Sequence, residues 1–334
     1  MTAPPSGLEE RTPSEGDVAS LARQLAPALL EACDGKLSDL RWFRSDWQRG
    51  GAATAYARWR DDAGSRDVLV KLPVGPMEHR ATLALSHLSD APTPRVAAAG
   101  DELGGYDLAW LVLERLDGEP MAKAPTKKTL DALAQAAASF WALARDALGE
   151  PAPDAFERNG WQATLEAART RLRDNAVPDA QRWNNEIKRV QRALPAVADR
   201  FDEARVAEAS WRHGDLHPGN AMLRSEDSSW GEPGCVLIDL GEVRPGSWIE
   251  DAVGFERLYW GREEKLHGFK PVKALARARK SRGLPLQDDW RELADIRRAL
   301  LAAAAPASLS RNGDPQHLAG ALRTLEQACD RLGL

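Results

Sequence analysis

The stretch WRHGDLHPGN, residues 211–220, places two histidines, an aspartate and an asparagine within a few positions of one another. His213, Asp215 and His217 alternate, so on a β-strand they would share one face and could bind a metal ion. The Pro-Gly pair behind them would break such a strand. The other histidines also lack the spacing of metal ligands: His79, His87, His267 and His317. A structural alternative to a metal centre is a turn in which Asp215 caps backbone N–H groups.

A structural turn does not explain the acidic residue that follows. Asp239 lies nineteen residues after Asn220, directly behind the apolar run Val236–Ile238. Transfer of a phosphoryl group from ATP needs a carboxylate that orients the acceptor hydroxyl and takes its proton. It also needs oxygen ligands for Mg²⁺. Asp215 fits the first role, while Asn220 and Asp239 offer the oxygens, so these three residues are the predicted catalytic set and the last two the predicted metal ligands.

HGDLHPGN (213–220) followed by VLIDLGEVRPGSWIEDAV (236–253) resembles the catalytic loop and magnesium-binding aspartate of the aminoglycoside phosphotransferase and choline kinase superfamily. The resemblance is dense over residues 211–254 and weaker from about 40 to 120. It implies the bilobal fold of protein kinases, with ATP or GTP as the phosphate donor. His213 resembles the loop histidine of this family, which supports the loop by hydrogen bonds. Asp251 matches an aspartate that orders the loop, although it could equally be an acid at a helix N-terminus.

The resemblance also implies a lysine on the third strand that binds the α- and β-phosphates. Lys71 in VLVKLP stands at that position, and Glu78 on the following helix is the candidate for its partner. Only seven residues separate the two, which is tighter than is usual in the family. The alternatives are an exposed strand end for Lys71 and a solvated glutamate, favoured by the helix dipole, for Glu78.

The remaining predicted nucleotide contacts are backbone groups. Gly50 and Gly51, between the first two predicted strands, could bind phosphate through N–H groups, although Gly-Gly is also an ordinary hairpin turn. The segment LVLERLDGEP resembles the family's hinge, in which backbone groups near Glu114 and Leu116 would bind adenine. His217 receives no role.

The elements that must position these residues fall into two parts, and the predicted fold class is α+β. After a disordered tail at 1–15, residues 16–115 form an N-terminal lobe that binds the nucleotide. It contains a first helix at 16–34, a small antiparallel sheet, and one main helix at about 76–89. Residues 116–334 form a mostly helical lobe with the catalytic loop and acceptor site, including helices at 126–148, 155–174 and 179–204.

Composition excludes several classes of protein. A net charge of −5 and a pI of about 5.8 argue against nucleic-acid binding. The first residues lack the apolar stretch of a signal peptide, and no apolar run has the length of a membrane span. The three cysteines are far apart, which argues against disulfides or a zinc knuckle. We therefore expect a cytoplasmic enzyme that contacts neither membrane nor nucleic acid, of unknown oligomeric state.

The acceptor is expected to be a small molecule with a hydroxyl group. Residues 251–334 contain 15 basic and 11 acidic residues, a net charge of +4. This balance argues against a polycationic aminoglycoside and for a neutral or anionic acceptor. The alternatives are a protein kinase and a catalytically weak nucleotide-binding regulator. Against a protein kinase, the sequence after Asp239 has no APE-like segment and no room for a long activation loop.

Overall fold

The computed structural model describes residues 20–44, 52–62, 64–152 and 158–334. The predicted tail at 1–15 and the glycines at 50 and 51 lie outside these residues. Contacts divide the chain into two units: Met1–His79 with Pro94–Arg115, here called the N-terminal unit, and Arg80–Thr93 with Leu116–Leu334, the C-terminal unit. In the part of the chain that is described, no helix has both the length and the apolar composition of a membrane span.

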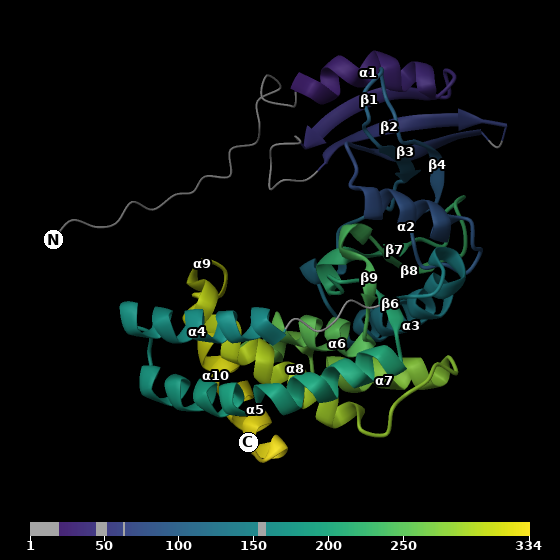
Figure 1. Ribbon diagram of the computed structural model, residues 1–334. Helices are drawn as coiled ribbons and strands as arrows, with labels where there is room; N and C mark the ends of the chain where they lie inside the picture. The colour runs from purple at the N-terminus through teal and green to yellow at the C-terminus, as the bar shows by residue number, and fades with distance from the viewer. Residues whose placement is uncertain (1–19, 45–51, 63, 153–157) are drawn as a thin grey trace. The chain divides into compact units, whose positions relative to one another are not determined.

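The N-terminal unit is built on a five-stranded antiparallel sheet with the order β1-β2-β3-β5-β4. Figure 1 labels β1, β2, β3 and β4 of this sheet. Alternating apolar residues make β3 amphipathic, with every second side chain in its last part buried. The β5 segment is buried along its whole length and is apolar except for its last residue, Glu114, as expected of a strand covered on both faces. The strands are β1 (Leu37–Arg44), β2 (Ala53–Asp61), β3 (Gly64–Leu72), β4 (Val96–Gly100) and β5 (Trp110–Glu114).

Two helices accompany this sheet. α1 (Ser20–Ala32) lies along the sheet and buries Ala22 against Ala53 of β2, with Trp42 of β1 packed on the same cluster. α2 (Pro76–Ser86) begins shortly after β3, and its first turn belongs to the N-terminal unit. The observed α1 and α2 are shorter than the predicted 16–34 and 76–89, and residues 16–19 lie outside the described part.

The C-terminal unit is mostly helical, and its long helices pack through apolar stripes rich in alanine, leucine and tryptophan. Figure 1 shows α4, α5, α8 and α10 side by side. The helices are α3 (Lys127–Leu148), α4 (Arg158–Asp174), α5 (Ala180–Ala207), α6 (Trp248–Arg257), α7 (Pro271–Ser281), α8 (Trp290–Ala304), α9 (Leu309–Asn312) and α10 (Pro315–Leu332). Short 3₁₀ turns are η2 (Met121–Lys123), η3 (Pro218–Asn220), η4 (Leu240–Glu242), η5 (Glu263–Leu266) and η6 (Ala305–Ser308).

Two small antiparallel ribbons interrupt the helices and carry the loops of interest. The first pairs β6 (Ser210–Arg212) with β9 (Arg244–Gly246). The second pairs β7 (Ala221–Arg224) with β8 (Gly234–Leu237). Together with the sheet and the helices, these ribbons confirm the α+β, protein-kinase-like class predicted from the sequence.

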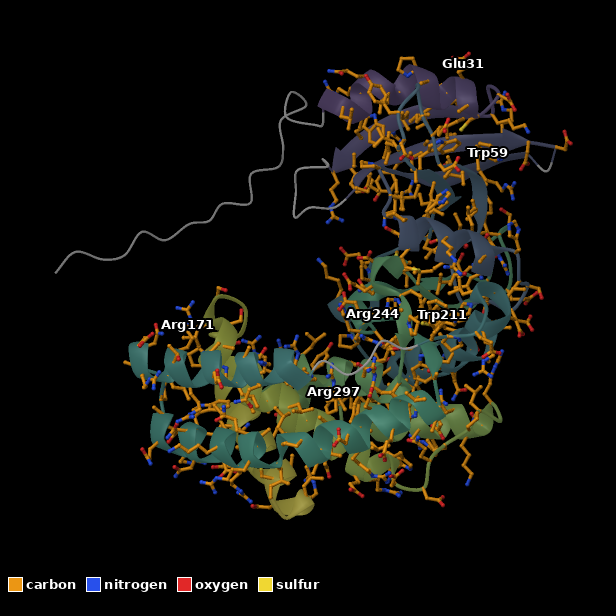
Figure 2. The ribbon with its side chains drawn as sticks, in the orientation of Figure 1. Glu31, Trp59, Arg171, Trp211, Arg244 and Arg297 are labelled. Atoms are coloured by element: carbon orange, nitrogen blue, oxygen red, sulfur yellow. The ribbon has the colours of Figure 1, made fainter. Side chains whose placement is uncertain are left out.

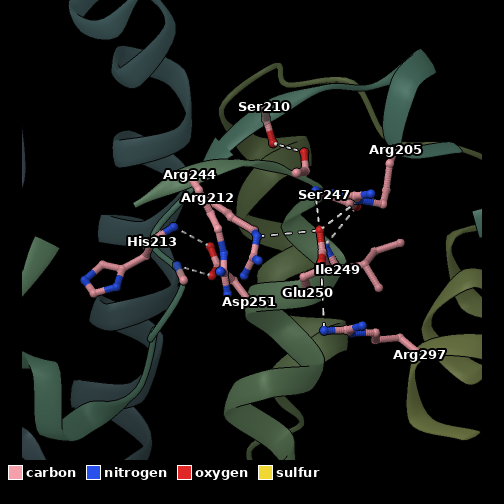
Figure 3. Close-up of polar contacts among 12 residues, drawn as sticks. Arg205, Ser210, Arg212, His213, Arg244, Ser247, Ile249, Glu250, Asp251 and Arg297 are labelled. Carbon is pink, nitrogen blue, oxygen red and sulfur yellow. Dashed lines mark hydrogen bonds and ion pairs between the residues drawn. The ribbon is translucent and has the colours of Figure 1, made fainter. Parts of the chain in front are cut away.

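A buried ionic cluster connects β6 to three helices of this unit (Figure 3). Glu250 of α6, whose side chain is 5% exposed, lies within ion-pair distance of Arg205, Arg212 and Arg297, at 3.3, 3.6 and 3.8 Å. Its Oε2 also accepts the backbone N–H of Ser247 at 3.0 Å, which closes a capping box at the start of α6. Burial raises the pKa of Glu250, but the three guanidinium groups outweigh it, so the net direction is down and the group stays ionised.

Removing the carboxylate of this cluster should be costly, because it would leave three guanidinium groups buried around an unpaired position. We predict that Glu250→Ala lowers the free energy of unfolding by about 3–5 kcal/mol, measured by urea denaturation. The control is Glu226→Ala, an exposed acid in the same unit, which should change stability by less than about 0.5 kcal/mol. Similar losses in both variants would contradict the role assigned to the cluster.

Candidate active site

The loop that follows β6 is fixed by the carboxylate of Asp251, which comes from α6 and is 2% exposed. Asp251 Oδ2 accepts the backbone N–H of His213 at 2.9 Å, and Oδ1 accepts that of Gly214 at 2.8 Å. The indole N–H of Trp141 on α3 donates to Oδ2 at 3.1 Å. The expectation that Asp251 bonds to the loop is therefore confirmed, and the residue also lies in the first turn of a helix.

The entry to the loop is held by Trp211 on β6 (Figure 2). Its indole N–H donates to the carbonyl of Gly149 at 2.7 Å, and the guanidinium of Arg80 lies 5.9 Å from the ring centroid. Three residues later, Gly214 has a φ of +86°, and a Cβ there would meet the carbonyl oxygen of Glu242 at 2.0 Å. Only glycine lets the loop pass this close to η4.

His213 is fully buried and supports the loop from below. Its Nδ1 accepts a hydrogen bond from the backbone N–H of Asp215 at 3.3 Å, while Nε2 lies 3.2 Å from the carbonyl oxygen of Ile238. These contacts fit a neutral ring with its proton on Nε2. Burial lowers the pKa of His213 more strongly than the nearby Asp251 and Asp215 raise it. The ring is therefore shielded from solvent, and its two nitrogens bind backbone groups that support the loop.

The Asp215 side chain is about half exposed, and one of its two carboxylate oxygens, Oδ2, accepts a hydrogen bond. Its Oδ2 accepts a hydrogen bond from Asn220 Nδ2 at 2.8 Å, and His217 Nε2 lies 3.4 Å from the same oxygen. His217 Nδ1 accepts the N–H of Gly219 at 2.9 Å, which directs the ring proton of a neutral imidazole toward Asp215. The hydrogen bond from His217 lowers the pKa of Asp215 against the opposing effect of burial, so the carboxyl group is ionised.

Asp215 Oδ1 has no hydrogen bond to any residue in the described part of the chain. His217 received no role from the sequence. Its contact with Asp215 was not predicted, because the spacing of the two residues was considered only for a shared metal ion. Within the described residues no group of three histidine, cysteine or acidic side chains could hold a metal ion by itself.

The β7–β8 ribbon brings Asn220 and Asp239 to the same end of a hairpin. The N–H of Ile238 donates to the carbonyl oxygen of Asn220 at 3.0 Å, and the next residues, Ala221 and Leu237, are partners in the ribbon. Asp239 follows with a φ of +64°, at the start of η4, and its side chain is exposed. Because Asn220 also binds Asp215, the three predicted catalytic residues lie around one point of the C-terminal unit.

In the N-terminal unit, Lys71 and Glu78 form an ion pair between Lys71 Nζ and Glu78 Oε1. Their side chains are only 18% and 12% exposed. Lys71 is therefore not an exposed strand end, and Glu78 is not a solvated glutamate. Lys71 is flanked by Thr54 on β2 and Leu111 on β5, which makes its strand internal to the sheet. The seven-residue separation is sufficient because α2 begins only a few residues after β3 ends.

The two residues of the predicted hinge lie at the end of β5: Glu114 is its last residue and pairs with Val68 of β3, and Leu116 follows two positions later. The Glu114 side chain is buried, and its carboxylate accepts a hydrogen bond from the backbone N–H of Arg95 at 3.1 Å. This bond ties the end of β5 to the residue before β4. Leu116 is partly exposed in the connection beyond the strand. Gly50 and Gly51 lie outside the described residues.

The depressed pKa of His213 has a consequence for stability. The unfolded chain binds a proton near pH 6.5, whereas the buried ring resists it, so the stabilisation is complete above that pH and is lost as pH falls below it. We predict that His213→Gln flattens the dependence of unfolding free energy on pH between 7 and 5, by up to about 1.4 kcal/mol per pH unit. The exposed His87, replaced as His87→Gln, should retain the wild-type slope; an unchanged slope in the His213 variant would refute the assignment.

Comparison with known proteins identifies the family and the fold of the chain. The model of the phosphotransferase enzyme family matches residues 48–296. A candidate aminoglycoside phosphotransferase from Ralstonia eutropha JMP134 superposes with a TM-score of 0.56 at 12% identity, covering 92% of this chain and 98% of that one. No curated protein matches the chain.

Two further solved structures are similar at the level of the fold. APH(2")-IIIa, solved with GDP and kanamycin, has a TM-score of 0.52 at 13% identity, covering 92% of this chain and 99% of that one. A thermostable mutant of APH(4)-Ia, solved with AMP-PNP and hygromycin B, has a TM-score of 0.51 at 16% identity, with coverages of 91% and 97%. These likenesses extend over nearly the whole chain, and the family model spans well over half of it. The chain belongs to the phosphotransferase enzyme family.

Proposed function

We propose that this protein transfers the γ-phosphate of ATP, or of GTP, to a hydroxyl group of a small molecule. The observation that carries the proposal is the arrangement around Asp215: one carboxylate oxygen is held by Asn220, and the other is open. Asn220 in turn shares a hairpin end with the exposed Asp239. A base, an amide oxygen and a second carboxylate at one point match the needs of phosphoryl transfer.

In this proposal Asp215 orients the acceptor hydroxyl and takes its proton through Oδ1. The hydrogen bond from Asn220 to Oδ2 fixes the plane of the carboxylate, and the lowered pKa keeps it ready as a base at neutral pH. His213 remains a neutral brace, since both ring nitrogens are engaged with backbone groups.

The donor set fits Mg²⁺, a hard cation that prefers carboxylate and amide oxygens. Asn220 donates through Nδ2 to Asp215, which leaves its amide oxygen for a metal, and the Asp239 carboxylate has no hydrogen bond to a described residue. Asn220 and Asp239 would hold the ion, and bound Mg²⁺ would neutralise charge on the phosphate oxygens of the nucleotide.

Lys71 would bind the α- and β-phosphates, with its ammonium group oriented by Glu78. Backbone groups near Gly50 and Gly51 would contact phosphate, and those at Glu114 and Leu116 would bind the base. GDP in one similar structure and AMP-PNP in another support a purine nucleotide as the donor.

A small acceptor is favoured over a protein by the length of the segment behind Asp239. Only residues 240–247 separate it from α6, and they form η4 and β9. Kanamycin and hygromycin B accompany two of the similar structures. The net charge of +4 over residues 251–334 argues against a polycationic acceptor here.

The test is an ATP-consumption screen over hydroxyl-bearing metabolites and antibiotics, with each product identified by its mass. The proposal predicts at least one phosphorylated small molecule whose formation needs Mg²⁺. Phosphate found only on added protein substrates, or nucleotide binding with no turnover of any acceptor, would overturn it.

Two substitutions separate the roles of the acidic residues. We predict that Asp215→Asn lowers turnover by about 10²–10⁴-fold and leaves nucleotide affinity nearly unchanged. Asp239→Ala should instead weaken Mg²⁺·ATP binding, measured by calorimetry. The exposed Asp227→Asn is the matched control for both. Equal and mild effects of the two substitutions would contradict the assigned roles.

A further inference from the structure

Arg279 of α7 is a buried cation that the mechanism above does not use. The residue is 3% exposed. Burial lowers the pKa of its guanidinium group to about 10, against the opposite effect of the Glu208 carboxylate, so the group is charged at neutral pH. A charge inside a protein is unfavourable unless neighbouring groups stabilise it. The groups that surround this guanidinium therefore indicate what it does.

The guanidinium group is held by one carbonyl oxygen and by two indole rings. Its Nε and Nη2 both donate to the carbonyl oxygen of Pro285, behind α7, at 3.3 and 2.8 Å. Its Cζ lies 5.4 Å from the ring centroid of Trp141 and 5.4 Å from that of Trp248. The two ring centroids are 6.2 Å apart, with an interplanar angle of 58°. One cation thus packs on two rings of different orientation.

Both rings are buried, which strengthens their attraction for the cation. Trp141 is 4% exposed and Trp248 is not exposed at all. A guanidinium over an indole is attracted by the π electrons of the ring, and the attraction is larger where water is excluded. Trp141 comes from α3, and Trp248 is the first residue of α6. Arg279 therefore joins α3, α6 and α7 at one point and restrains the plane of each ring.

The orientation of the Trp141 ring matters because of its N–H group. Nε1 donates to Asp251 Oδ2 at 3.1 Å, and the same oxygen accepts the backbone N–H of His213 at 2.9 Å (Figure 3). An indole N–H lies in the plane of its ring, so a tilt of the ring bends this hydrogen bond and weakens it steeply. The carboxylate also holds the backbone of Gly214, directly before Asp215. A change in the ring plane is therefore transmitted to the loop.

We propose that Arg279 is a positioning residue for the phosphotransfer: it fixes the plane of the Trp141 ring, and through Asp251 it fixes the backbone that carries Asp215. The effect on turnover rests on the proposed function. The geometric part, from Arg279 to the loop backbone, does not. The alternative is a purely structural role, in which Arg279 only holds three helices together. The two roles differ in what happens at the loop when Arg279 is replaced.

The first measurement is hydrogen exchange at the backbone N–H of His213, followed by NMR of the full chain with nitrogen-labelled histidine. The chain has six histidines, and the His213 signal is identified by its loss in His213→Gln. Arg279→Met removes the charge and both donors and leaves an unbranched apolar side chain. We expect it to raise exchange at His213 by at least about tenfold. The reference is His267, whose N–H donates to Glu264 outside this set of contacts.

Two matched variants complete this measurement. Arg277→Met removes an arginine from an exposed position of the same helix and should leave exchange at His213 unchanged. Arg279→Lys keeps the cation and should retain most of the protection. A lower melting temperature in Arg279→Met with unchanged exchange at His213, relative to His267, would show a purely structural role and overturn the proposal. Equal effects of the Arg277 and Arg279 variants would also overturn it.

Trp141→Phe covers the case in which Arg279→Met does not fold. This substitution keeps an aromatic ring beside the cation and removes only the N–H that Asp251 accepts. It should by itself raise exchange at His213, because the shared oxygen loses one of its donors. Unchanged exchange in Trp141→Phe would break the connection between Arg279 and the loop and would overturn the proposal.

Kinetics with the acceptor found by the screen test the effect on turnover. We expect Arg279→Met to lower kcat by about tenfold while the KM for the nucleotide changes by less than about twofold. The double variant with Trp141→Phe should be no slower than the slower single variant, because both changes act on one contact. Fully additive losses would contradict the proposal.

The exchange and kinetic results separate this inference from the proposed function. Faster exchange at His213 in Arg279→Met, with no phosphotransfer by the wild type, would reject the proposed function and retain the connection to the loop. Phosphotransfer by the wild type, with unchanged exchange in that variant, would retain the function and reject the positioning role.

Discussion

The loop after β6, which carries Asp215, depends on one buried carboxylate. Asp251 is shielded from water and receives three N–H donors, two from the loop backbone and one from Trp141. A buried carboxylate that lost these donors would carry an unpaired charge, so the loop backbone and α6 hold each other in place. Glu250, the preceding residue, holds β6 through an ion pair with Arg212 and also pairs with two arginines from other helices. Adjacent acids on one helix thus fix the strand and the loop that positions Asp215.

The order of chemical groups was predictable from the sequence, because Asp215, Asn220 and Asp239 follow one another in two short motifs. Their proximity was implied only by the family resemblance, and the structure accounts for it by the pairing of β7 with β8. The sequence left the Lys71–Glu78 pair open, as only the brief connection between β3 and α2 makes so small a separation sufficient. Gly50 and Gly51 lie outside the described residues, so the phosphate contact predicted there stays a prediction.

Contacts over long separations could not be predicted. The arginines around Glu250 come from α5, β6 and α8, and no local pattern links them. The same holds for Gly261 and Gly320: a Cβ on Gly320 would lie 2.2 Å from the nitrogen of Gly261, a contact between segments that are far apart in the sequence.

The central claim is that Asn220 and Asp239 hold the metal of a nucleotide substrate beside the base Asp215. The most direct measurement is a crystal structure with Mn²⁺ and AMP-PNP, in which anomalous scattering locates the ion. The account predicts a peak at coordination distance, about 2.1 Å for an ion of this kind, from oxygens of both Asn220 and Asp239, with Lys71 on the phosphates. Bound nucleotide whose metal is held by other residues, with Asp215 remote from the γ-phosphate, would contradict it.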